Sequence, residues 1–190
     1  MRAAIAALVV SSVALGGCFT VRPVNGEATP IGKNLDMRLP ATPGYPGRFS
    51  ATQTVVGNYG GQKGAFQAVL DFSPDKATVV ITAVSGPRIL GLTWTSKGII
   101  EDRTPLAPAN LKGISILGDI FVALWPVEAV QRAMPDGVTV TVDGNIRRVK
   151  TADRVIEEVE TKPSDGAAMR QEVRNLDFGY QLTIITEKAG

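Results

Sequence analysis

The chain has 190 residues, enough for one ordinary domain. Its 20 Lys and Arg nearly balance 18 Asp and Glu, and this formal net charge of +2 excludes a nucleic-acid binder that works by neutralising phosphates. With no histidine and a single cysteine, the chain has no Ser-His-Asp or Cys-His catalytic site, no imidazole metal site and no intramolecular disulfide.

Residues 1–17 have the pattern of a secretory signal peptide. Arg2 precedes an uncharged apolar run, Ala3 to Leu15, that is shorter than the roughly 20 residues a membrane-spanning helix needs. The segment Leu15-Gly16-Gly17-Cys18 resembles the bacterial lipobox. This resemblance implies cleavage before Cys18 and acylation of that cysteine with chains such as palmitate. The alternative is an ordinary secretory signal with a cysteine there by chance.

The residue after the cysteine bears on location in two-membrane bacteria. An Asp at this position tends to hold a lipoprotein at the inner membrane, whereas this chain has Phe19. The resemblance therefore implies a protein anchored by its acyl chains on the periplasmic side of the outer membrane.

Residues 18–48 are rich in proline and glycine, with five prolines after Cys18. This composition predicts an extended tether after the lipid anchor that the lipobox resemblance implies, with docking of the later half on the domain as the alternative. Residues 49–190 are then expected to form a single domain.

From residue 49 on, runs rich in Val, Ile, Thr and aromatic residues alternate with turn signals, which predicts antiparallel hairpins. The first group of predicted strands covers residues 51–57, 65–72, 77–84, 88–94 and 99–102. The Gly-rich stretch 57–64 is expected to be a hairpin loop, because a strand follows where a phosphate-binding loop needs a helix. The second group covers residues 138–142, 146–150, 154–160, 169–176 and 180–187.

A helical pattern separates the two groups of strands. Apolar residues recur at three- and four-residue spacing, and Asp119 is the only charged residue between Ile114 and Trp125. Pro126 is expected to break this helix and to begin a second one over residues 127–134. The sequence thus predicts a mainly β fold with an inserted helical segment.

The segment Gly118 to Pro126 resembles the Asp-x-x-x-x-Leu-Trp-Pro segment of a family of small bacterial outer-membrane lipoproteins of unknown function. Gln53, the strand 66–72, the turn 86–88 and the ending 176–182 agree with it. The order of elements is also distantly similar to the lipoprotein carriers LolB and LolA. This similarity implies an incomplete antiparallel β-barrel whose inserted helical lid covers an apolar concavity.

The leading functional hypothesis is therefore the binding or transfer of a hydrophobic lipid or lipoprotein ligand. The candidate contact residues are Phe66, Leu70, Phe72, Leu90, Leu92, Trp94, Ile120, Phe121, Leu124 and Trp125. The alternative for each of them is that it simply fills the core.

The second hypothesis is a structural or assembly lipoprotein that binds a protein partner of the cell envelope through a strand edge or the tether. We expect no enzyme activity, cofactor or metal. The acidic run Glu157, Glu158 and Glu160 fits a solvated sheet surface better than an acid/base pair. Asp119 is the polar residue of most interest, as a helix cap or as a partner of a neighbouring loop.

Overall fold

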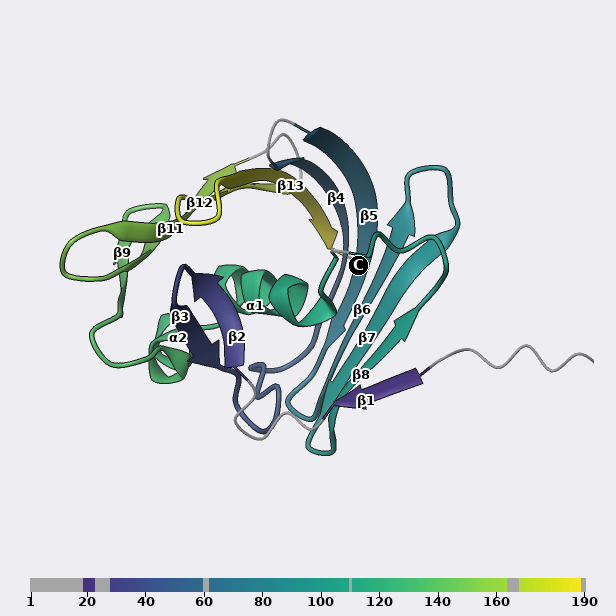
Figure 1. Ribbon diagram of the computed structural model, residues 1–190, viewed down its shortest axis with the longest axis horizontal. Coiled ribbons are helices and arrows are strands. Elements are labelled where there is room, and N and C mark those ends of the chain that lie inside the picture. Colours follow the sequence, from purple (N-terminus) through teal and green to yellow (C-terminus); the bar gives the residue numbers. More distant parts are fainter. Residues whose placement is uncertain (1–18, 23–27, 60–61, 110, 164–167, 189–190) are drawn as a thin grey trace, which may run out of the picture.

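The fold is described by a computed structural model, which covers residues 19–22, 28–59, 62–109, 111–163 and 168–188. The predicted signal peptide and Cys18 lie outside these residues. The dominant feature is an 11-stranded antiparallel sheet that curves around a helix (Figure 1). Its strand order is β1-β8-β7-β6-β5-β4-β13-β12-β11-β10-β9.

Two consecutive runs of hairpins build the sheet. The first contains β4 (Phe49–Tyr59), β5 (Gln62–Phe72), β6 (Lys76–Ala83), β7 (Arg88–Thr95) and β8 (Gly98–Arg103). The second contains β9 (Thr139–Asp143), β10 (Ile146–Lys150), β11 (Val155–Pro163), β12 (Met169–Asn175) and β13 (Tyr180–Lys188). Pairing of β4 with β13 joins the two runs, while β1 (Phe19–Arg22) pairs with β8. Among the described strands, β1 and β9 therefore form two separate edges, and the sheet does not close on itself.

The predicted strands all exist, with ends that differ by a few residues. The Gly-rich stretch 57–64 is the main difference, because β4 continues to Tyr59 and β5 begins at Gln62. Most of the expected loop is therefore paired strand, in which Gly57 lies opposite Gly64. Backbone pairing of the two strands continues through these residues, with Asn58 opposite Lys63, and overrides the local turn preference of glycine.

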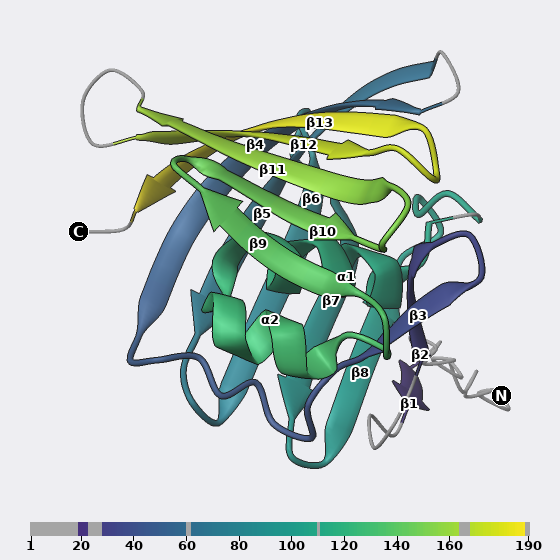
Figure 2. The same cartoon turned by 90° about the vertical axis from the view of Figure 1, so that its left-hand side faces the viewer.

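Two helices connect the two runs, α1 (Gly113–Leu124) and α2 (Val127–Ala133). Pro126 separates them as expected. The long helix α1 lies inside the curve of the sheet (Figure 1), and α2 lies beside β9, the edge strand of the second run (Figure 2). Within the described residues, neither helix is long and apolar enough to cross a membrane.

Four aromatic rings form the centre of the core. Trp125 lies with its ring centroid 4.9 Å from that of Phe72, 5.3 Å from Phe121 and 6.0 Å from Trp94. All four side chains are at most 1% exposed. The indole N–H of Trp125 donates a hydrogen bond of 2.7 Å to the carbonyl oxygen of Pro43, so this large side chain is buried with its polar group satisfied.

Residues 28–48 pack on the domain, which corrects the expectation of an extended tether for this part of the chain. They form a second small sheet, β2 (Ala28–Gly32) and β3 (Leu35–Arg38), against α1 and β11. Ile31, Met37 and Leu39 are each at most 4% exposed. Gly118 permits this contact, because a Cβ there would come within 2.7 Å of Thr29 Cγ2. The domain therefore begins before residue 49.

Candidate functional site

A partly enclosed apolar groove lies between α1 and the inner face of the sheet. Its cavity volume is about 60 Å³. Its walls come from α1 and from β4, β5, β6, β12 and β13. We call it the α1 groove, and the residues that line it are Gln53, Val55, Phe66, Ala68, Ile81, Ile116, Asp119, Ile120, Ala123, Leu124, Gln171, Val173, Leu182 and Ile184.

The sequence of α1 gives the helix two apolar sides. Ile116, Ile120 and Leu124 recur every four residues and face the groove. Leu117 and Phe121 follow the same spacing one residue later and are at most 1% exposed in the core. A helix that is apolar on most sides must meet apolar surroundings on most sides. Here the core supplies one part of those surroundings and the groove the other.

The C-terminal end of α1 is held by a side chain from the sheet. Arg147 of β10 donates to the carbonyl oxygen of Trp125 at 2.9 Å and also to that of Val122. These carbonyls belong to the end of the helix, where no intrahelical donor remains and where the helix dipole favours a positive charge. Burial lowers the pKa of Arg147, while the nearby charge of Glu128 raises it. This contact fixes α1 against the second run of strands.

The ten predicted contact residues separate into two sets. Three of them line the α1 groove, namely Phe66, Ile120 and Leu124. The other seven lie in the core, each at most 2% exposed: Leu70, Phe72, Leu90, Leu92, Trp94, Phe121 and Trp125. Alternation along β5 and β7 identified the inner face of the sheet, but α1 covers only part of that face. The side on which α1 packs decides which residues meet the groove.

The groove also contains side chains that sequence reasoning did not select. They come mainly from β12 and β13, where Val173, Leu182 and Ile184 supply apolar wall. Gln53 and Gln171 are each 3% exposed and bring two amides to this wall. Gln53 donates from Nε2 to Thr186 Oγ1 at 3.1 Å. The available signal was the place of each residue in the strand alternation.

A cluster of polar side chains lies at one end of the groove. Asp119, on the groove side of α1, accepts a hydrogen bond of 2.7 Å from the Tyr180 hydroxyl of β13. On the neighbouring strands, Asn175 Nδ2 donates to Glu157 Oε2 at 3.2 Å. Asp119 therefore bonds to a strand and caps no helix end. Glu157 is only 2% exposed, which corrects its assignment to a solvated surface.

Burial sets the protonation behaviour of this cluster. It raises the pKa of Asp119 to about 7, although the hydrogen bond from Tyr180 acts in the opposite direction. Burial also raises the pKa of Glu157, and the nearby Asp119 carboxyl raises it further. Two acidic groups that share a desolvated region cannot both ionise without a large penalty. We therefore expect at least one of them to hold a proton near neutral pH.

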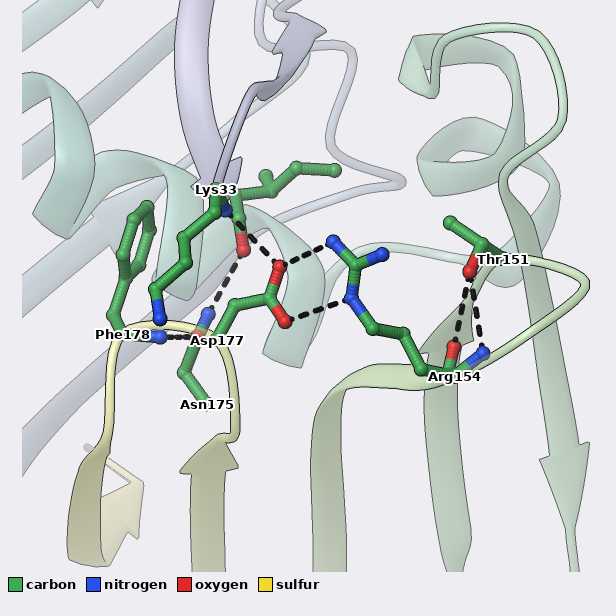
Figure 3. A network of polar contacts seen from close by, with 7 residues as sticks. Lys33, Thr151, Arg154, Asn175, Asp177 and Phe178 are labelled. Atoms are coloured by element: carbon green, nitrogen blue, oxygen red, sulfur yellow. Dashed lines mark hydrogen bonds and ion pairs between the residues drawn. The ribbon is translucent and has the colours of Figure 1, made fainter.

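The turn between β12 and β13 fastens the β2–β3 hairpin beside this cluster (Figure 3). Asn175 donates to the carbonyl oxygen of Ile31 at 2.9 Å and accepts from the backbone N–H of Phe178. Asp177 accepts from the backbone N–H of Lys33 at 3.0 Å and from both Nε and Nη2 of Arg154. These contacts hold the hairpin against α1 and β11.

The side chains at the groove favour binding of an apolar molecule. The described residues contain no group of three or more His, Cys, Asp or Glu side chains that could hold a metal ion. The lining is mostly aliphatic with a few polar groups, which is the usual character of a site for apolar ligands.

Comparison with known protein families identifies the family of this chain. Residues 50–188 match the family model described as "Protein of unknown function (DUF3261)". The chain belongs to this family. The match includes every strand of the sheet from β5 to β13 and both helices, and thus the whole of the α1 groove. The resemblance to a family of unknown function that the sequence motifs indicated is confirmed. No curated protein matches the chain.

Proposed function

We propose that this DUF3261 protein binds the apolar chain of a lipid or of an acylated protein in the α1 groove. The observation that carries the proposal is the groove itself, an apolar space with three polar side chains in its lining: Gln53, Asp119 and Gln171. The incomplete barrel with a helix in its concavity is the arrangement expected of LolA- and LolB-like carriers, and this likeness supports the proposal by analogy.

The size of the groove defines how much of a ligand it holds. A space of about 60 Å³ holds only a few groups as large as a water molecule. A methylene group is about as large as a water molecule, so the groove suits a short part of an acyl chain.

A series of 1-alkanols of increasing length tests the proposal on residues 19–190, which retain every element that the structure describes. The displaced probe is the neutral fluorophore N-phenyl-1-naphthylamine. We expect affinity to rise up to about fourfold per methylene, from about 0.8 kcal/mol of burial each, and to level off once the groove is full.

Ile120→Trp should reduce binding at least about tenfold, because the larger side chain occupies the groove. Ile100→Trp is the matched control, since Ile100 is 40% exposed on β8 and lies away from the groove. Equal effects of the two variants, or no binding by the unaltered chain, would reject the proposal. The second hypothesis, a lipoprotein that binds an envelope protein partner, would then take its place.

We further propose that acyl chains on Cys18 anchor the protein at the periplasmic face of the outer membrane. Cys18→Ala should abolish metabolic labelling with palmitate, because Cys18 is the only cysteine. Phe19→Asp should keep the label and move the protein toward the inner-membrane fraction. Labelled Cys18→Ala protein, or unaltered protein found mainly in the inner membrane, would contradict the respective part of this prediction.

A further inference from the structure

The polar atoms of the α1 groove are unevenly satisfied. Gln171 of β12 is 3% exposed, and its Nε2 donates to Thr161 Oγ1 at 3.3 Å. Its carbonyl oxygen, Oε1, is buried and has no hydrogen-bond partner among the described residues. A buried acceptor without a donor is unfavourable, because it has given up water and gained nothing in return. A ligand that brings a donor to this oxygen would remove that penalty.

The register of the strands places Gln171 in a row of residues that line the groove. Gln171 lies opposite Ile184 of β13, which lies opposite Val55 of β4, which in turn lies opposite Phe66 of β5. All four residues line the groove. Gln171 is therefore at one end of a row of apolar side chains that crosses the sheet. A molecule lying along this row would have its apolar chain on Val55 and Phe66 and its polar group near Gln171.

The charges around the groove determine whether the polar group of a ligand can be charged. None of the described lining residues is Lys or Arg, and Asp119 is the one acidic residue among them. Glu157 is close enough to Asp119 for the Asp119 carboxyl to raise the pKa of Glu157. A carboxylate or phosphate inside the groove would find no cation and would lie near acidic side chains. An uncharged donor such as a hydroxyl or amide N–H meets neither obstacle.

We propose that the α1 groove selects uncharged amphiphiles whose hydroxyl or amide N–H donates to Gln171 Oε1, in preference to ionised fatty acids. The ligand class is thus an aliphatic chain with a neutral hydrogen-bond donor at its polar end. This inference rests on the proposed function, since it specifies the ligand of the same groove.

Four ligands with the same ten-carbon chain test the selectivity at pH 8 by displacement of N-phenyl-1-naphthylamine from residues 19–190. Decan-1-ol and decanamide carry a neutral donor, decyl methyl ether has only an acceptor, and decanoate is ionised. We expect the two donors to bind roughly tenfold more tightly than the ether, the ratio expected for one hydrogen bond to a buried acceptor, and decanoate to bind weakest.

Gln171→Leu should reduce the difference between decan-1-ol and decyl methyl ether to less than about twofold, because it removes the acceptor. Gln67→Leu is the matched control, because Gln67 is exposed on β5 and lies outside the groove lining. The comparison of ligands on the unaltered chain decides the question even if Gln171→Leu does not fold.

The outcomes separate this inference from the proposed function. Equal binding of all four ligands would overturn the selectivity and leave the groove as an acyl site. Binding of the ether as tight as that of the alcohol would mean that Gln171 presents its NH₂ group, and would overturn the donor requirement. No displacement by any ligand, with no binding of the fluorophore, would overturn the proposed function itself.

Discussion

Phe121→Ala is expected to lower the free energy of unfolding by about 3–5 kcal/mol, the usual range for removal of a buried aromatic side chain. Phe121 is 0% exposed and lies between Trp94 and Trp125, with ring centroids 6.2 and 5.3 Å away. These neighbours belong to a strand and to the residue after α1, so they cannot collapse into the space without moving the helix. Equilibrium unfolding in urea measures the loss.

Leu124→Ala is the matched comparison, because Leu124 also belongs to α1 but is half-buried and lines the groove. We expect it to cost less than half as much stability and to weaken alkanol binding. Phe121→Ala should keep binding within about twofold under conditions in which it is folded. Similar small losses of stability in both variants would show that Phe121 does not lie in a filled core.

The free energy of unfolding is expected to fall as the pH rises from about 5 to 8. Burial raises the pKa of Asp119 to about 7 from an ordinary value of 3.8. In this interval the folded chain holds a proton that the unfolded chain has released, so raising the pH favours unfolding. The part of this rise that falls between pH 5 and 8 corresponds to at most about 3 kcal/mol. Asp119 is partly exposed, which reduces the expected change to roughly 1–3 kcal/mol.

Asp119→Asn should flatten this dependence, because the amide does not ionise. Some slope should remain from Glu157, whose pKa is also raised by burial. Asp75→Asn, at an exposed turn, should leave the slope unchanged. The hydrogen bond from Arg154 lowers the pKa of Asp177, so this carboxyl contributes stability that is lost as the pH falls toward its pKa. The measurement stays above pH 5 to keep this opposite effect out of the interval. Unfolding free energies that stay constant or increase from pH 5 to 8 would contradict the assignment.

The local pattern of the sequence predicted the elements well. Period-two alternation located β5 and β7, and three- and four-residue spacing located α1, because these periods follow directly from backbone geometry. Pro126 ended the first helix for an equally local reason, the missing N–H of proline. The mainly antiparallel fold with an inserted helical segment could therefore be predicted without coordinates.

The docking of the N-terminal segment could not be predicted in this way. Prolines and glycines between residues 28 and 48 favour extended backbone, but they do not show whether that backbone meets a partner. The contacts that decide this come from distant parts of the chain, such as the indole of Trp125 on Pro43 and the close approach of Thr29 to Gly118. An extended segment and a docked one have the same local preferences.

The sequence by itself thus determined the strands, the helices and the inner face of the sheet. The tertiary structure decided which part of that face is core and which is groove. Phe72 and Phe66 share one face of β5, yet Phe72 packs among the aromatic rings and Phe66 lines the groove. The difference depends on where α1 rests, because a helix covers only part of a wide curved sheet. Gln171 and Glu157 are polar residues of strands, yet both are at most 3% exposed in the folded chain.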